Sequence, residues 1–120
     1  MVKENILNGA EKIAAERKKQ IDSGWTIEED VIGNNNEQLS LAAGCYAFPE
    51  VYRGSWKSLG GILSENWPWQ KKYWKPSPKN RIDELVKAGA LAAAEIDRLL
   101  YLENRDKIKN KTTGPKKEKK

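Results

Sequence analysis

Aromatic and basic side chains alternate in one stretch of the chain, and together they could bind a nucleotide-like anion. Trp67, Trp69 and Trp74 lie among lysines that include Lys75, and Arg81 follows shortly after. Indole faces stack on nucleobases for roughly 1–3 kcal/mol each, and lysine or arginine neutralises a phosphate. We also expect Arg81 in the first turn of a helix, where free backbone amides favour an anion. This stretch therefore predicts a binding site for a small phosphate-bearing ligand.

Two residues upstream, Arg17 and Trp25, are candidates to contact the same ligand. Arg17 and Gln20 are three residues apart on one face of a predicted helix, and Trp25 follows the turn that ends it. A structural interpretation stands beside this one, because the tryptophans of a short helical protein can form its core and the lysines its wetted rim. The sequence leaves both interpretations open.

The chain contains one cysteine and no histidine, which excludes several classes of enzyme. Histidine acid–base catalysis, serine and cysteine triads and the usual zinc hydrolases all need residues that are absent here. Cys45 lies beside Tyr46 in an apolar stretch and predicts a buried, inert thiol. We therefore predict no catalytic residue, and a protein that binds rather than one that turns over a substrate.

Scattered carboxylates raise the alternative of a magnesium-dependent nucleotide pyrophosphohydrolase, since all-α enzymes of that kind hold Mg²⁺ with acidic side chains. The candidates are Glu28, Glu29, Asp30, Glu37, Glu84, Glu95 and Asp97. Their spacing argues against this alternative, because Glu95 and Asp97 diverge by about 200° around a helix. We predict no metal site and no cofactor.

The net charge of +5 is distributed unevenly along the chain, which bears on the partner. Residues 103–120 contain eight basic and three acidic side chains, so they hold all of it. Residues 1–102 are neutral in sum, but residues 51–81 carry +6 between two acidic segments. A neutral body is atypical of duplex-binding proteins, whereas a local basic patch fits a small anion. We predict no specific nucleic-acid partner.

Helices around one irregular loop are expected to position these residues. Apolar residues recur at helical spacing from about Glu4 to Asp22, and Ser23-Gly24 ends this helix. Residues 25–36 are predicted to be a linker. An Asn34–Glu37 capping box is expected to open a second helix that ends before Pro49. Prolines and glycines over residues 49–77 leave room only for a helical turn near residues 55–64.

The last predicted helix begins with Ser77 as N-cap and Pro78 as first residue, and it runs to about Arg105. An apolar stripe on it is expected to face the core: Ile82, Leu85, Val86, Gly89, Ala92, Ala93, Ile96, Leu99 and Leu100. Its small residues suit close approach by the Ala42-Ala43-Gly44 segment or by a second copy of the chain. Since two short helices cannot cover the whole stripe, we predict a homo-oligomer.

The fold class predicted from these elements is all-α. Residues 1–105 are expected to form a single small domain of three to four helices with a long Trp/Pro-rich loop. A disordered, lysine-rich tail over residues 106–120 should follow. The chain has no run of about 18 apolar residues that could span a bilayer, and its first residues show no targeting signal. We therefore expect a cytoplasmic protein with no membrane partner.

A series of short motifs resembles a family of small proteins encoded by bacteriophages and prophages, over about residues 11–100. The motifs are Glu16-Arg17, Gln20-Ile21, Gly24-Trp25-Thr26, Trp67-Pro68-Trp69, Trp74-Lys75-Pro76, Leu85 to Leu91 and Ala94 to Arg98. Where that family commonly reads Gly-Trp-Thr-Pro-Glu-His-Asp-Asp, Ile27 takes the proline place and Glu29 the histidine place. Any histidine-dependent chemistry of relatives would therefore not carry over.

The resemblance implies a phage-encoded accessory protein that acts inside a host bacterial cell. Small phage proteins of this size include ones that counter bacterial immunity by binding nucleotide-derived second messengers. By this analogy, we expect sequestration of an anionic nucleotide-like ligand. A third alternative is an adaptor that binds a host protein through exposed tryptophans.

Overall fold

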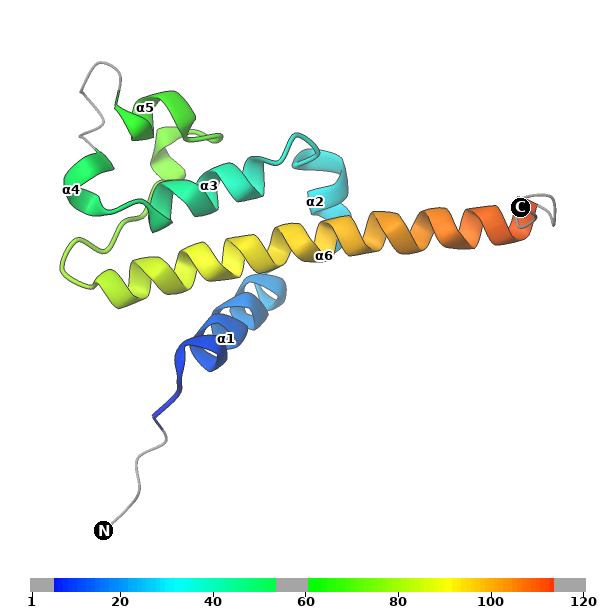
Figure 1. Ribbon diagram of the computed structural model, residues 1–120, viewed down its shortest axis with the longest axis horizontal. Coiled ribbons are helices and arrows are strands. Elements are labelled where there is room, and N and C mark those ends of the chain that lie inside the picture. Colours follow the sequence, from blue (N-terminus) through cyan, green and yellow to red (C-terminus); the bar gives the residue numbers. More distant parts are fainter. Residues whose placement is uncertain (1–5, 54–60, 114–120) are drawn as a thin grey trace, which may run out of the picture.

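The described residues, 6–53 and 61–113, form helices only in the computed structural model (Figure 1). In chain order the elements are α1 (Gly9–Asp22), α2 (Ile27–Gly33), α3 (Gln38–Ala47), α4 (Glu50–Arg53), α5 (Ile62–Asn66), the one-turn 3₁₀ helix η1 (Lys71–Tyr73) and α6 (Arg81–Thr113). These residues include no strand, and the predicted all-α class is confirmed.

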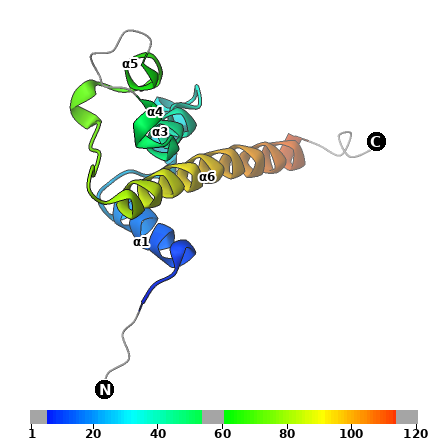
Figure 2. The ribbon, with the colours of Figure 1, turned by 60° about the vertical axis from the view of Figure 1, so that its left-hand side comes forward.

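The long helix α6 is the axis on which the other elements are arranged. Its 33 residues extend for about 50 Å at the usual helical rise. Helices α1, α2 and α3 each pack against α6, with α1 and α3 on opposite sides of it (Figure 2). The C-terminal part of α6 projects beyond the other helices (Figure 1). The packed core therefore sits around the N-terminal two-thirds of α6.

The core is made where α3 lies against α6. It consists of Leu39, Ala42, Ala43 and Tyr46 from α3 and Ala88, Leu91 and Ala94 from α6, with Trp67, Trp69 and Trp74 packed against it. Alanines on both helices let the two backbones approach closely, so the predicted contact between the Ala42-Ala43-Gly44 segment and the last helix is confirmed. Cys45 is buried as predicted, and burial raises the pKa of its thiol.

The expected orientation of α6 is wrong for its large apolar residues. Ile82 is 64% exposed and Ile96 is 56% exposed, and Leu85, Leu99 and Leu100 are also exposed. The side of α6 that faces the protein carries alanines together with three buried charged side chains, namely Glu84, Glu95 and Arg98. These charges are paired, which is why they tolerate burial. The apolar stripe therefore faces away from the core.

The first helix begins five residues later than predicted, at Gly9. The Asn8 side chain accepts a hydrogen bond from the Glu11 backbone, and the Glu11 carboxylate accepts one from the Asn8 backbone, both at 2.9 Å. This capping box is absent from the predicted helix. It fixes the start of α1 directly after Asn8, which still has an extended backbone. The predicted end at Ser23-Gly24 is confirmed, with Gly24 at φ +102°. Residues 1–5, where the prediction began, lie outside the described residues.

Residues 25–36 are not simply a linker, because α2 forms within them. Thr26 caps this helix by accepting a hydrogen bond from the Glu29 backbone at 3.2 Å, and the acidic residues of the first turn favour its positive end. Asn34 ends α2 and does not cap α3, so the predicted Asn34–Glu37 capping box is wrong. Glu37 precedes α3 in a left-handed conformation without a side-chain cap.

Both predicted ends of the last helix are wrong. Asn80 accepts a hydrogen bond from the Asp83 backbone at 3.0 Å, so Asn80 rather than Ser77 caps α6. At the other end α6 continues to Thr113, eight residues past Arg105. Residues 106–113 contain no glycine or proline, and the sequence reaches such a break only at residues 114 and 115. The first eight residues of the predicted tail are thus helical, and residues 114–120 lie outside the described residues.

Candidate functional site

An open pocket of about 660 Å³ lies between the end of α1, α2, the 67–75 segment and α6. Aromatic rings dominate its walls: Trp25, Tyr46, Trp67, Trp69 and Tyr73. Leu91 of α6 is a further wall, and amines and carboxylates make up much of the rest. We call this hollow the aromatic pocket. It brings together four residues that were predicted as ligand contacts, namely Trp25, Trp67, Trp69 and Lys75.

The aromatic rings support one another through edge-to-face contacts centred on Trp67. Its ring lies 5.4 Å from that of Trp69, 5.7 Å from that of Tyr46 and 5.1 Å from that of Trp74. Tyr46 and Trp74 stack at 4.6 Å with their planes 27° apart. Such pairs add about 0.5–1.5 kcal/mol each beyond the burial of area. The 67–74 segment is therefore well supported although it contains little regular structure.

Helix α2 orients Trp69 through a chain of hydrogen bonds. The Trp69 indole N–H donates to Asn34 Oδ1 at 3.0 Å, and Asn34 Nδ2 donates to Asp30 Oδ1 at 2.8 Å. Burial raises the pKa of the Asp30 carboxyl, and the hydrogen bond from Asn34 and the charge of Arg17 offset only part of that effect. Asn34 is thus fixed by a donor on one side and an acceptor on the other. Trp69 is held at the pocket wall by a helix that the sequence did not reveal.

The backbone of Lys75 is fixed from two sides, which leaves its side chain at the pocket. Its N–H donates to the Tyr46 hydroxyl at 3.0 Å, and its carbonyl accepts from Lys87 Nζ at 2.6 Å. Lys87 also lies 5.7 Å from the centre of the Tyr46 ring. Burial raises the pKa of the Tyr46 hydroxyl, so this group is neutral at physiological pH. Tyr46, Lys75 and Lys87 together form one corner of the aromatic pocket.

The pocket lining is neutral in sum, which corrects the picture of a purely basic patch. Three amines line it, from Lys19, Lys75 and Lys87, and three carboxylates do so, from Glu16, Glu29 and Asp30. Lys19 lies 4.0 Å from Glu16, and Lys87 lies 3.6 Å from Asp83. Among the described lysines of residues 51–81, Lys71, Lys72 and Lys79 are not part of the lining. A ligand in the aromatic pocket therefore meets both signs of charge.

Trp25 is the most exposed tryptophan among those described at the pocket, with 45% of its surface accessible. The left-handed Gly24 turn carries the chain from α1 to Trp25, whose backbone N–H returns to Gln20 O at 3.0 Å. The Trp25 ring meets that of Trp69 edge to face at 6.4 Å. Nearly half of the Trp25 surface is thus accessible at the edge of the aromatic pocket.

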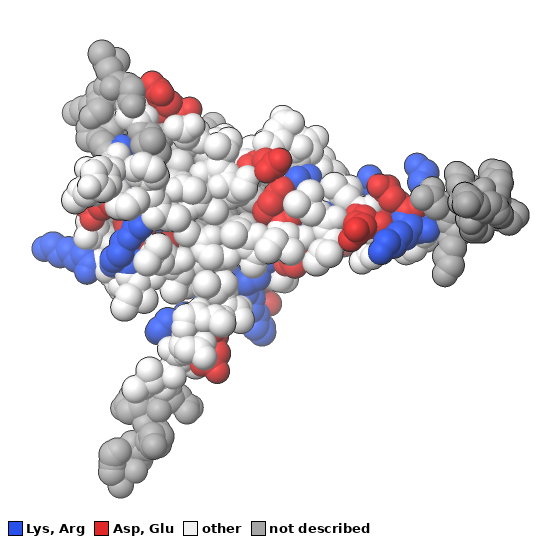
Figure 3. Space-filling model, viewed as in Figure 1, with Lys and Arg blue, Asp and Glu red and all other residues white. Residues whose placement is uncertain are grey.

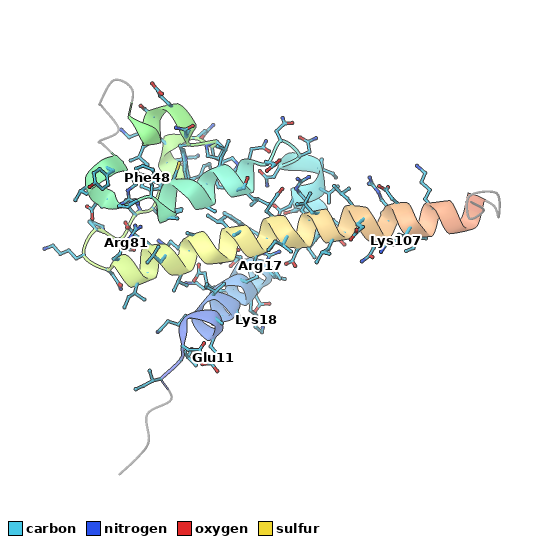
Figure 4. The ribbon with its side chains drawn as sticks, viewed as in Figure 1. Glu11, Arg17, Lys18, Phe48, Arg81 and Lys107 are labelled. Atoms are coloured by element: carbon cyan, nitrogen blue, oxygen red, sulfur yellow. The ribbon has the colours of Figure 1, made fainter. Side chains whose placement is uncertain are left out.

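Two predicted ligand contacts, Trp74 and Arg81, lie behind the pocket wall. Trp74 stacks on Tyr46, and the Arg53 guanidinium lies 5.2 Å from the centre of its ring. Arg81 donates from Nη1 to Tyr46 O and to Glu84 Oε1, each at 2.9 Å, and from Nη2 to Ala47 O. It sits below the end of α3, at the start of α6 (Figure 4). Both residues support the site rather than line it.

Arg17 lies outside the aromatic pocket, where α1 meets α6 (Figure 4). It is buried, and its Nε donates to Asp97 Oδ2 at 3.1 Å. Its Nη1 reaches Gln20 at 3.5 Å, while Nη2 has no hydrogen-bond partner among the described residues. Arg17 does not line the aromatic pocket but borders a shallow groove between α1 and α6.

Several residues that build the site were missed in the sequence. The sequence pattern predicts Asn34 as a helix cap and places Tyr46 in an apolar stretch, and neither prediction indicates a pocket residue. Lys87 lies four residues before Leu91, and this spacing places both on one face of α6, which could have linked them. For Lys19 and Glu16 no sequence signal separates a pocket wall from an ordinary solvated helix surface.

Within residues 6–53 and 61–113, no group of three or more acidic, cysteine or histidine side chains is arranged to hold a metal ion. None of the helices in these ranges combines the length and the apolarity that a bilayer crossing requires.

The fold and the site define a small all-α protein with an aromatic, mixed-charge pocket between its helices. Comparison of the chain with protein-family models, with curated proteins and with solved structures found no match.

Proposed function

We propose that the protein binds and sequesters a small ligand that combines a planar aromatic ring with an anionic group, as a nucleotide does. The observation that carries this proposal is the aromatic pocket, where five aromatic side chains meet three lysines. Its volume of about 660 Å³ lies within the range of about 300–1,000 Å³ that is usual for small-molecule sites.

Stacking supplies the first part of the recognition. The exposed ring of Trp25 and the fixed ring of Trp69 present apolar surface to a base, and each stacked ring contributes about 1–3 kcal/mol. Because Asn34 holds Trp69 in place, little side-chain entropy is lost when a ligand stacks there.

Charge supplies the second part. The Lys75 ammonium is the clearest candidate for a phosphate, since its backbone is anchored while its side chain is exposed. Lys19 and Lys87 add two further amines at the same pocket. Glu29, also in the lining, offers a carboxylate that can accept from an amino group on the base. A zwitterionic lining therefore fits a nucleotide better than it fits inorganic phosphate alone.

A phage-encoded role against host immunity, in the cytoplasm of a bacterial cell, remains a prediction from the resemblance of the motifs. The sequestered ligand would then be a nucleotide second messenger of the host. The aromatic pocket supports the ligand class and is independent of that biological setting.

A thermal-shift and calorimetry panel of nucleoside monophosphates and cyclic nucleotides tests the proposal, with nucleosides and inorganic phosphate as separate arms. A ligand at 100 times its Kd should stabilise the protein by about 2.7 kcal/mol. Trp25→Ala and Lys75→Ala should each weaken binding at least about tenfold. Tyr52→Ala and Lys79→Ala are matched controls, since both residues are exposed and absent from the pocket.

The proposal fails if no nucleotide binds, or if Trp25→Ala binds as tightly as the unmodified protein. Recovery of the nucleotide unaltered after long incubation separates sequestration from hydrolysis. A bound nucleotide that is converted to product would support the pyrophosphohydrolase alternative instead.

A further inference from the structure

The exposed face of α6 carries an apolar seam that the described part of the chain does not cover. Leu85, Ala92, Ile96 and Leu99 follow one another at spacings of seven, four and three residues, the repeat of a helix-packing seam. All four are exposed, and Ile82 and Leu100 flank them on one side. Figure 3 shows a surface without charged side chains along this half of α6, between α1 and α3.

The extent of this seam suits a protein interface. The three large side chains of the seam and the flanking Ile82 and Leu100 are each about half exposed. Together they present on the order of 500 Å² of apolar surface, against about 800 Å² per partner in a standard interface. Next to the seam, Ala10, Ala14 and Ile21 of α1 line the shallow groove with Ala93 of α6, and charged side chains of both helices border it.

We propose that a second copy of this chain covers the seam, with the two α6 helices antiparallel and a twofold axis passing beside Ala92. In that register, two residues face each other across the axis when their residue numbers add up to about twice 92, the number of the alanine at the axis. Leu85 then faces Leu99 of the partner subunit, and the small Ala92 side chains let the helices approach closely at the axis. Ile96 of the partner subunit then lies opposite the turn between Leu85 and Ala92.

Charge favours the antiparallel over the parallel arrangement. The seam continues beyond Leu99 to Glu103 and Asp106, which are exposed. A parallel pair would stack each of these carboxylates on its own copy, which is unfavourable. In the antiparallel pair Glu103 lies opposite Arg81 of the partner subunit, which carries the opposite charge.

Light scattering after size exclusion, across a dilution series, tests the interface. We expect a mass twice the 13.6 kDa of the chain, and a dimer Kd raised by about 100-fold or more in Ile96→Glu, because the twofold axis places two charges in the seam. Val51→Glu is the matched control, since Val51 is 81% exposed on α4 and away from the seam. Circular dichroism verifies that Ile96→Glu is folded, and Ile96→Ala serves if it is not. A monomer at every concentration, or a folded Ile96→Glu that dimerises normally, overturns the proposal.

Cysteine cross-linking in a Cys45→Ala background tests the orientation. A mixture of Leu85→Cys and Leu99→Cys chains should form a disulfide-linked dimer between the two variants, whereas neither variant alone should cross-link efficiently. Efficient cross-linking of each variant with itself would show a parallel pair. A dimer in which no combination cross-links would place the interface elsewhere. Either of these results refutes the antiparallel arrangement.

Discussion

Replacement of Glu84 by glutamine should destabilise the protein strongly, because this carboxylate joins three parts of the chain, namely α4, the segment before α6 and the start of α6. Glu84 is 1% exposed. Its oxygens accept from Arg53 Nη2 at 3.2 and 3.3 Å, from Arg81 at 2.9 Å and from the Ser77 backbone at 3.0 Å. Glutamine keeps the size of the side chain but leaves two guanidinium groups without their counter-charge.

The expected loss follows from how these partners are buried. Removal of one member of a buried ion pair typically costs about 3–5 kcal/mol. Arg53 is buried but keeps its hydrogen bonds to Cys45 O and Tyr46 O, and the Arg81 side chain is 35% exposed. The loss should therefore fall near the lower limit, about 3 kcal/mol, which corresponds to a decrease of roughly 10 °C in Tm for a chain of this length.

The pH dependence gives the prediction a second, independent readout. Burial acts to raise the pKa of Glu84, but the hydrogen bonds from Arg81, Ser77 and Arg53 outweigh it and lower the pKa below the ordinary value of 4.5. A carboxylate with a lowered pKa in the folded protein stabilises the fold above its ordinary pKa. That stabilisation is lost as the pH falls through the lowered value. The difference between the two proteins should therefore be full at pH 7 and shrink under acid conditions.

Urea unfolding followed by tryptophan fluorescence, at neutral pH and at a series of acid pH values, measures both effects. Glu65→Gln is the control because Glu65 is exposed, and it should change the free energy of unfolding by no more than about 0.5 kcal/mol. A Glu84→Gln protein that unfolds within 1 kcal/mol of the unmodified chain, or a difference that persists unchanged in acid, would refute this account of the network.

Three further substitutions test other parts of the description, all by the same urea titration. Gly24→Ala should cost about 1–2 kcal/mol through backbone strain alone, since φ is +102° and an added Cβ meets no atom within 4 Å. Gly89→Ala should destabilise the protein by about 1 kcal/mol, because the added Cβ would come within 2.4 Å of Ile13 Cδ1. In an Ile13→Ala background, the same substitution should be neutral or stabilising. Asn34→Leu should lower the free energy of unfolding by about 2 kcal/mol, because the Trp69 indole loses its acceptor and Asp30 loses its donor. The same variant should bind a nucleotide more weakly. Unchanged affinity would contradict the role given to Asn34.

The long helices could be predicted from the sequence because their apolar periods extend over several turns. Helix α2 was missed since seven residues with three acidic side chains show no such period. Its available signal was Thr26 followed three residues later by Glu29, the start of a capping box. The end of α6 was placed too early because charged residues were taken for disorder, although they are good helix formers.

The face of α6 that meets the core could not be predicted from hydrophobicity. Glu84, Glu95 and Arg98 are buried because partners neutralise them. One of those partners, Arg53, is 31 residues away from Glu84 in the chain and is brought near it only by the fold. The same limit applies to the candidate site. The sequence indicated the tryptophans of the 67–74 segment and Trp25 after the first helix, but it did not show that α2 supplies a further wall.

Helix α1 packs mainly against α6, so one wall of the aromatic pocket is held by a single neighbouring helix. Lys19, Gln20 and Trp25, at or just after the end of α1, contribute to the pocket wall. A segment held by one neighbour can detach at a lower free energy than the whole protein unfolds. Amide hydrogens of α1 should then exchange with solvent before those of α3. A nucleotide in the pocket should slow this exchange, because it holds α1 in place. Capture and release of the ligand would thus be timed by the local opening of a single helix.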